Sequence, residues 1–147
     1  MAIRFYRERD AYGFLSNFSA HGFTLEGRYW PTAEHYFQAK KFLEEAHAGA
    51  VHAAASPMEA KALGGDRARP LRPDWEAVKD EVMRKALVAK FTQHPDLRAA
   101  LLATGNEPLI EAAPRDYYWG SGADGSGRNR LGALLMEVRA SLRLGSE

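Results

Sequence analysis

The segment WPTAEHYFQAKKF, residues 30–42, brings a carboxylate, an imidazole, an amide and two ammonium groups together among four aromatic rings. A Pro-Thr pair is typical of a helix start and good helix formers follow, so we expect one α-helix from Thr32 to about Ala48. His35 falls on the mostly apolar side of this helix, which favours a packed or capping role. The side predicted to face the core carries Tyr36, Ala39, Phe42, Leu43 and Ala46.

At about 100° per residue, Glu34, Gln38 and Lys41 fall in one row on the other side of the helix, here called the polar row. Glu34 and Lys41 are two turns apart, about 10 Å along the axis, which is long for a surface ion pair but suits two ends of one small group. A purely structural explanation is also open. The helix dipole stabilises a glutamate in the first turn by under ~1 kcal/mol, and polar residues commonly coat a solvated helix face.

The segment GSGADG, starting at Gly120, matches the dinucleotide fingerprint G-x-G-x-x-G. That fingerprint needs a further strand and an acidic residue about 20 positions on, whereas residues 126–147 read as one helix, so we exclude a dinucleotide-binding fold. Two interpretations remain for residues 116–129, the glycine loop. Its backbone N–H groups and the helix start at Asn129 can receive a phosphate, or the loop is a tight surface turn with Asn129 as an ordinary N-cap.

Two tryptophans and three arginines stand at the boundaries of predicted elements. Trp75 and Trp119 can each stack on a planar ligand or plug the edge of the core. The arginines lie in DRARPLRP, residues 66–73, here called the basic loop, where they suit a phosphate or point into solvent: Arg67, Arg69 and Arg72. The five histidines show no metal-ligand spacing and cysteine is absent, so we expect neither a metal ion nor a cofactor.

The elements that must position these groups are mostly helices. The first 30 residues are rich in aromatics and broken by glycines, which favours short strands and turns. The fold class is therefore α+β, mainly helical, with a short strand-rich N-terminal part. After the first helix we expect a short strand at residues 109–112 and helices at 56–64 with Ser56 as N-cap, at 75–91 with Asp74 as N-cap, at 95–104, and from Asn129 onward.

Composition limits the class of protein. A chain of 147 residues suits a single domain over 1–147. No long uncharged apolar run is present and the N-terminus lacks a signal peptide's apolar core, so we expect a cytoplasmic protein with no membrane partner. The formal net charge is +1, so any binding of an anion must be local.

Four blocks of the sequence, in this order and at these separations, closely resemble the YbiA-like N-glycosidase family, also called NADAR: FYRERDAYGFLSNF, GRYWPTAEHYFQAKKF, LRPDWEAVKDEVMRKALVAKF and DYYWGSGADGSGRNRLGALLMEVR. The resemblance covers nearly the whole chain. It implies a compact, mostly helical fold and hydrolysis of the N-glycosidic bond between ribose and a base. The implied substrates are phosphoribosylated aminopyrimidine intermediates of riboflavin synthesis or, alternatively, ADP-ribosylated guanine, so nucleic acid is a partner only as such a substrate.

The resemblance also implies roles for residues. The family's Glu-His pair and the lysine after it map to Glu34, His35 and Lys41, and its Asp-Trp pair maps to Asp74 and Trp75. Where the family often has a Gly-Arg pair, this chain reads Gly65-Asp66-Arg67, which leaves open the arginine that meets a phosphate. The positions that we expect to bind substrate are Asn17, Arg72, Trp75, Asp116, Trp119, Gly120, Asp124 and Asn129.

Two mechanisms fit these residues. In one, Glu34 protonates the ring oxygen of ribose and Lys41 displaces the base through an imine. In the other, the base leaves through an oxocarbenium-like state, Glu34 or Asp116 activates water, and Lys41 only binds. A catalytically silent nucleotide or ADP-ribose binding module is the alternative from another class; it would tolerate loss of Glu34, and the presence of both Glu34 and Lys41 favours the enzyme.

Overall fold

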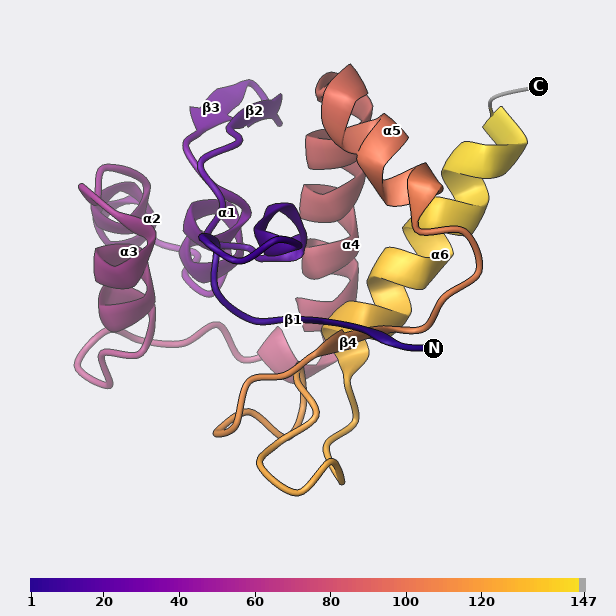
Figure 1. Ribbon diagram of the computed structural model, residues 1–147. Coiled ribbons are helices and arrows are strands. Elements are labelled where there is room, and N and C mark those ends of the chain that lie inside the picture. The colour runs from indigo at the N-terminus through magenta and orange to yellow at the C-terminus, as the bar shows by residue number, and fades with distance from the viewer. Residues whose placement is uncertain (146–147) are drawn as a thin grey trace.

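The computed structural model describes residues 1–145, and in that range it is a helical domain with four strands of three residues each (Figure 1). The α+β, mainly helical prediction is confirmed. The strands are β1 Ile3–Phe5, β2 Phe23–Leu25, β3 Arg28–Trp30 and β4 Leu109–Glu111. The helices are the 3-10 turn η1 Gly13–Leu15 and the α-helices α1 Ala33–Ala39, α2 Glu45–His52, α3 Pro57–Gly64, α4 Trp75–Gln93, α5 Pro95–Ala103 and α6 Arg130–Gly145.

The strands form two small sheets. β2 and β3 pair antiparallel around Glu26 and Gly27, whose φ angles of 55° and 80° are those of a two-residue hairpin turn. β1 and β4 pair in parallel, with Ile3 opposite Leu109 and Phe5 opposite Glu111. This second pair joins the N-terminal segment to the far half of the chain and fixes the strand that leads into the glycine loop.

Helix α1 is the centre of the domain. It packs against α2, α3 and α4, and all seven of its residues are buried (Figure 1). The predicted single helix to about Ala48 is wrong, because α1 ends at Ala39 and α2 begins only at Glu45. The reason is a long-range contact. A continuous helix would use the carbonyls of Lys40 and Lys41 internally. Here the Lys40 carbonyl accepts a hydrogen bond from the Arg72 guanidinium at 3.3 Å, and the Lys41 carbonyl accepts one from the Arg72 backbone N–H at 2.8 Å.

This break also corrects the predicted core face. Tyr36, Ala39 and Phe42 are buried as expected, but Leu43 is 68% exposed and Ala46 is exposed. Residues of the polar row, in contrast, are more buried than predicted. Glu34 and Gln38 are only 7% and 5% exposed, so the explanation as a solvated helix face does not hold for them.

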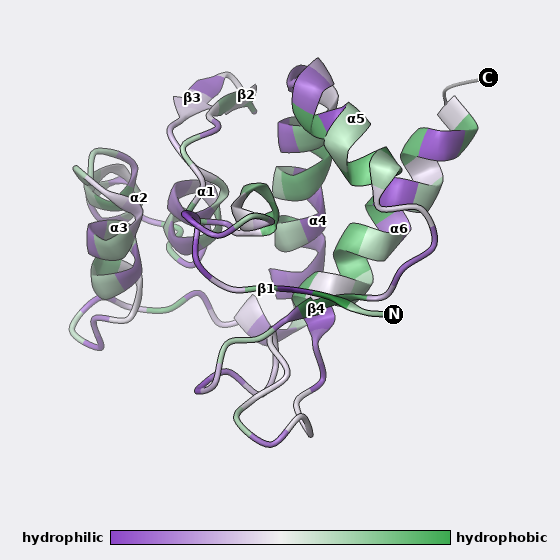
Figure 2. Ribbon diagram, viewed as in Figure 1, coloured by the Kyte–Doolittle hydropathy of each residue, from purple (hydrophilic) through white to green (hydrophobic). Residues whose placement is uncertain are grey.

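The other helices mostly confirm their sequence patterns. Figure 2 shows apolar bands along α4 and α6, and the predicted apolar face of α6 is buried at Leu131, Leu134, Leu135, Val138 and Leu142. Ser56 caps α3 as predicted, with its Oγ accepting a hydrogen bond from the Glu59 N–H at 3.1 Å. Asp74 precedes α4, but its side chain makes no capping bond and instead binds the Arg72 guanidinium at 2.7 and 3.0 Å.

One buried cation ties α4 to the N-terminal part. Lys90 is fully buried, and its ammonium donates to the carbonyls of Phe14 at 2.6 Å and Ser16 at 3.0 Å. These bonds hold the turn that leads into Asn17, next to the start of α1. Across residues 1–145, no helix is both long and apolar enough to cross a membrane.

Candidate active site

Glu34 lies in the first turn of α1, and the start of that helix is held by several hydrogen bonds. The Thr32 hydroxyl accepts a bond from the His35 N–H at 3.1 Å, and the Glu34 N–H donates to the Asn17 carbonyl at 3.1 Å. Gln38, one turn on, donates through Nε2 to Glu34 Oε2 at 2.7 Å. The His35 ring contacts the Thr32 hydroxyl and a backbone carbonyl, which is the packed, capping role predicted for it.

Burial is the main influence on the protonation of Glu34. Desolvation raises the pKa of its carboxyl, and the negative charge of Asp116 raises it further. The hydrogen bond from Gln38 and the positive charges of Lys61 and Lys41 act in the opposite direction and are outweighed. A carboxyl whose pKa is raised holds a proton more readily and can donate it to a substrate.

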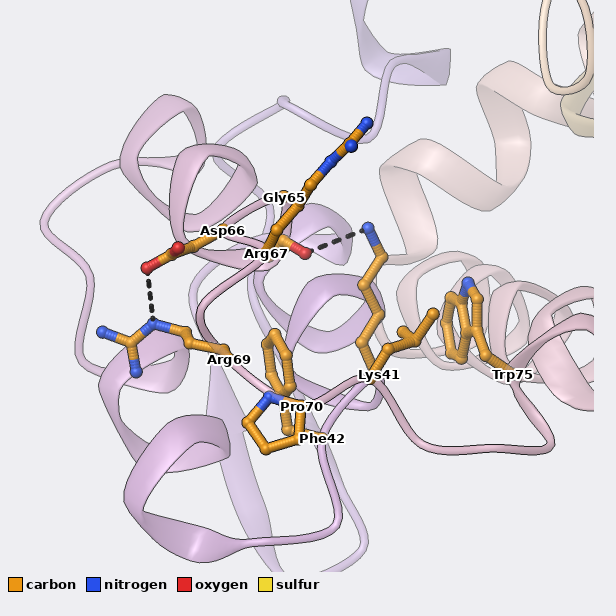
Figure 3. Close-up of a pocket in the computed structure, with 10 residues that line it drawn as sticks. Lys41, Phe42, Gly65, Asp66, Arg67, Arg69, Pro70 and Trp75 are labelled. Carbon is orange, nitrogen blue, oxygen red and sulfur yellow. Dashed lines mark hydrogen bonds and ion pairs between the residues drawn. The ribbon is translucent and has the colours of Figure 1, made fainter.

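Lys41 follows the last turn of α1 and borders a pocket (Figure 3). Its Nζ donates to the Gly64 carbonyl at 3.4 Å and lies 5.8 Å and 6.0 Å from the ring centres of Phe37 and Trp75. Burial lowers the pKa of this ammonium, an effect that the charge of Glu34 partly offsets. A lysine with a lowered pKa exposes the neutral amine that an imine mechanism requires.

The pocket has a volume of about 310 Å³ and lies between Lys41 and Trp75 on one side and residues 64–71 on the other. Arg67 and Arg69 both line it. Figure 3 shows the Arg67 side chain extending in the same direction as the Lys41 ammonium. One wall of the pocket is therefore basic and another is aromatic.

The three arginines differ in how they are used. Arg69 forms an ion pair with Asp66 at 3.6 Å and a hydrogen bond with the His47 ring at 2.9 Å. Arg72, which the sequence selected as a substrate-binding residue, pairs with Asp74, braces the end of α1 and does not line the pocket. Arg67 makes no hydrogen bond or ion pair within residues 1–145, so its guanidinium is the one left free.

The two tryptophans meet on one ring of α1. Phe37 packs edge-on against Trp75 at 5.1 Å and against Trp119 at 5.3 Å between ring centres. Trp75 is 5% exposed and Trp119 is partly buried. Trp75 therefore packs in the core and also lines the pocket, and its stacking on a ligand stays a prediction.

The glycine loop is held by its own polar side chains. Asp116 Oδ1 accepts hydrogen bonds from the backbone N–H groups of Tyr118 at 3.0 Å and Trp119 at 2.8 Å. Gly120 is buried, and a Cβ there would lie within 3.1 Å of the carbonyls of Asp116 and Glu111. Asp116 and Gly120 thus shape the loop beside the site.

Asp124 and Asn129 both make hydrogen bonds within the chain. Asp124 is exposed and accepts hydrogen bonds from Ser126 at 2.7 and 3.0 Å. Asn129, with a φ of 50°, accepts a bond from the Glu111 N–H at 2.9 Å and donates to the Leu109 carbonyl at 2.9 Å. Both polar atoms of the Asn129 side chain are therefore used to hold β4, and its role in binding substrate stays a prediction.

Asn17 lies next to the N-terminus of α1, where its carbonyl accepts the Glu34 N–H, and its role in binding substrate stays a prediction. Its Nδ2 contacts Met83 Sδ at 3.3 Å, while its Oδ1 is buried without a hydrogen-bond partner. Gln38 Oε1 is also buried and unpartnered. Buried acceptors without partners are costly, and hydroxyl groups of a bound sugar would satisfy them.

Glu111 was missed by the sequence interpretation. It ends β4, and burial, together with the negative charges of Asp116 and Glu34, raises its pKa to about 7 against the opposing charge of Lys61. The available signal was strand alternation, which places Glu111 on the same side of β4 as the buried Leu109. Within residues 1–145, no cluster of three or more histidine and acidic side chains is arranged to hold a metal ion.

Comparison with known proteins adds to this geometry. The sequence model of the NADAR domain family matches residues 4–143. The N-glycosidase YbiA of Escherichia coli is 53% identical over 142 residues, which cover 97% of this chain and 89% of that protein. The NMR structure of E. coli YbiA superposes with a TM-score of 0.92 at 52% identity, covering 99% of this chain and 86% of that one.

Two further relatives have different names. An N-glycosidase of Nostoc punctiforme is 48% identical over 146 residues, covering 97% of this chain and 94% of that protein. The chloroplastic riboflavin biosynthesis protein PYRR of Zea mays is 40% identical over 155 residues, covering 95% of this chain and 25% of that protein.

Proposed function

Because the chain belongs to the NADAR domain family and is a hydrolase of N-glycosyl compounds, we propose that its substrate is a phosphoribosylated aminopyrimidine of the kind formed in riboflavin synthesis. The products are then the free aminopyrimidine and ribose 5-phosphate.

The observation that carries this proposal is the pairing of Lys41 with a basic wall and an aromatic wall in one small pocket. A volume of about 310 Å³ is at the lower end of the range for small-molecule sites. Arg67 offers an unpaired guanidinium for a phosphate, and Trp75 offers an aromatic surface for the base. Support for the pathway comes from the maize relative, which is named a riboflavin biosynthesis protein.

The first chemical step requires an acid. The lone pair of the glycosidic nitrogen forms a C1=N double bond while the bond between C1 and the ring oxygen breaks, and that oxygen takes a proton. Glu34 supplies the proton, because its buried carboxyl has a raised pKa. The sugar is then an open chain joined to the base as a protonated imine.

The second step requires a nucleophile. The neutral amine of Lys41 adds to C1, one of its protons passes to the nitrogen of the base, and the base leaves as a free amine. This exchange leaves an imine between C1 and Lys41, which water hydrolyses to the sugar aldehyde and the free lysine. The lowered pKa of Lys41 favours this step.

A direct route uses the same residues in another way. The nitrogen of the base takes a proton and leaves with the electrons of the C1–N bond while the ring stays closed, and C1 becomes an oxocarbenium-like centre. Water then bonds to C1 as it gives a proton to a carboxylate. Lys41 then only binds the substrate. Both routes give the same products, so the route is a separate question from the identity of the substrate.

Mass spectrometry of products tests the substrate. The enzyme is incubated with the phosphoribosyl aminopyrimidine, with the same compound lacking its phosphate, and with an oligonucleotide carrying ADP-ribosylated guanine, with Glu34→Gln protein as the blank. We expect ribose 5-phosphate and free base from the first compound at the highest kcat/KM. Preferred release of ADP-ribose from guanine, or binding of these compounds without cleavage, would contradict the proposal.

A further inference from the structure

Lys90 on α4 is completely buried, yet its ammonium has no carboxylate partner within residues 1–145. Burying a charged group without an opposite charge is costly for a fold. The ammonium instead donates to two backbone carbonyls, those of Phe14 at 2.6 Å and Ser16 at 3.0 Å. The cost of this burial favours a function for the part of the chain that Lys90 holds in place.

The carbonyls that Lys90 holds come directly before the residue that binds the start of α1. Ser16 is followed by Asn17, whose carbonyl accepts a hydrogen bond from the Glu34 N–H at 3.1 Å. Glu34 lies in the first turn of α1, where a backbone N–H has no partner within the helix. A planar peptide joins the Ser16 carbonyl to the Cα of Asn17. Lys90 therefore fixes the chain one residue before the carbonyl that receives the Glu34 N–H.

The same face of α4 also contacts the side chain of Asn17. Met83 and Lys90 are seven residues apart, or about two turns, which places them on one side of the helix. Met83 is buried, and its Sδ lies 3.3 Å from Asn17 Nδ2. Helix α4 thus holds Asn17 both by its side chain and by the carbonyl that precedes it.

Another side chain of α4 binds the N-terminal segment further along the chain. Gln93 donates through Nε2 to the Thr24 carbonyl at 2.7 Å, and its Oε1 accepts from the Thr24 N–H at 2.9 Å. Thr24 is an exposed residue of β2, seven positions after Asn17. Lys90 and Gln93 each make two hydrogen bonds from one helix to one segment, but those of Lys90 adjoin the residue that binds Glu34. The two side chains therefore form a natural pair for comparison.

We propose that Lys90 is a positioning residue for the hydrolysis: its bonds to the Phe14 and Ser16 carbonyls hold the Asn17 carbonyl, and through it the start of α1 and Glu34, in place for proton transfer. The inference rests on the role of Glu34 proposed above. Lys90 does not line the pocket and acts through Glu34 alone. An acid that must reach one atom of the substrate loses rate steeply when it is displaced. A displaced Glu34 would also meet more water, and because desolvation raises its pKa, that pKa should fall.

Variants of the two α4 side chains separate positioning from support of the fold. Lys90→Met removes the donors, and Gln93→Ala, the matched control, removes two hydrogen bonds made by the same helix. Below the Tm of both variants, we expect kcat of Lys90→Met to fall by about tenfold or more with KM little changed, because the proton moves only in the transition state. The pH limb above which Glu34 loses its proton should move to lower pH. Gln93→Ala should lower Tm and keep the wild-type kcat and pH profile.

Hydrogen exchange of the Glu34 N–H, followed by NMR, reports the same contact without turnover. In Lys90→Met this amide should exchange faster relative to the amides of α6, whereas in Gln93→Ala its relative rate should match the wild type. Lys90→Gln, which keeps an N–H donor, should be intermediate in kcat and exchange, and it serves if Lys90→Met does not fold.

Wild-type kcat in the Lys90 variants, unchanged exchange of the Glu34 N–H, or an equal fall of kcat in Gln93→Ala would each overturn the inference. If the wild type does not cleave the phosphoribosyl compound, the substrate proposal fails instead. The exchange rates then still decide whether Lys90 holds Glu34.

Discussion

The glycine pair that ends α3 allows a sharp test of how the site is packed. A Cβ on Gly64 would lie 1.9 Å from Gln38 Oε1 and 2.7 Å from Gln38 Cδ, so Gly64→Ala must displace that side chain. A Cβ on Gly65 would meet only the carbonyls of Lys61 and Ala62, at 3.5 and 3.8 Å, which is ordinary contact. Gly65→Ala is therefore a matched control one residue away.

The expected magnitude follows from what Gln38 loses. Overpacking costs about 1–3 kcal/mol, and loss of the bond from Gln38 to Glu34 adds about 1 kcal/mol. The better helix propensity of alanine offsets up to about 1 kcal/mol. The net loss of unfolding free energy is about 2 kcal/mol, or a Tm lower by about 6 °C for a domain of this size.

The same displacement should change the chemistry. The hydrogen bond from Gln38 lowers the pKa of Glu34, so its loss should move the pH limb controlled by Glu34 to higher pH. We expect kcat/KM to fall about tenfold as the carboxyl loses its fixed position. Gly65→Ala should stay within about 0.5 kcal/mol of wild type, as is usual for surface substitutions.

Thermal unfolding and a pH profile of kcat/KM measure these effects. In a Gln38→Ala background the two nearest atoms, Oε1 and Cδ, are gone and only the Cβ of residue 38 remains, at 2.9 Å, so Gly64→Ala should cost less there than in the wild type. A Gly64→Ala enzyme with wild-type Tm and activity would refute this view of the packing. Equal damage from Gly65→Ala would refute it as well, since that site has room.

Three further predictions concern single residues. Glu34→Gln should lower kcat by about a hundredfold or more in a steady-state assay, with an unchanged circular dichroism spectrum; retained activity would remove Glu34 from the mechanism. Burial lowers the pKa of Lys90 to about 7 from the ordinary 10.5, so the unfolded chain binds more protons between these values, and unfolding free energy should rise with pH there by up to ~1.4 kcal/mol per unit. Unfolding free energies from urea titrations at several pH values should show that slope in the wild type and not in Lys90→Met. Equal slopes in the two proteins would contradict the lowered pKa of Lys90. Arg67→Gln should raise KM about tenfold for the phosphorylated substrate and not for its dephosphorylated form, whereas Arg72→Gln should chiefly lower Tm; the reverse pattern would assign the phosphate to Arg72.

The elements were predictable where local signals decide them. Ser56 caps α3, the strand at Leu109 was expected within one residue, and the apolar spacing of α6 matches its buried face. The end of α1 was not predictable in this way. Arg72, some thirty residues on, takes the carbonyls that would have continued the helix, and local propensity contains no trace of that contact.

The site, too, was predictable only where spacing along one helix decides it. Helical spacing brought Glu34 and Gln38 together correctly, and the two are hydrogen-bonded. Their burial could not be foreseen, because it depends on how α2, α3 and α4 surround α1. Alternation places Glu111 on the same side of β4 as Leu109, but a three-residue strand does not show from the sequence which of its sides is buried, so Glu111 was missed. Burial raises the pKa of its carboxyl, and the charges of Asp116 and Glu34 raise that pKa further; both effects arise only in the folded chain.

Borohydride reduction during turnover tests most directly whether Lys41 takes part in breaking the N-glycosidic bond. The enzyme is mixed with the phosphoribosyl aminopyrimidine, reduced, digested and analysed by peptide mass spectrometry, with Lys40→Ala as the control beside Lys41→Ala. We predict one reduced phosphoribosyl group on the peptide at Lys41, present in Lys40→Ala and absent in Lys41→Ala, whose turnover is lost. Continued turnover by Lys41→Ala, with no adduct in the wild type, would contradict the imine mechanism.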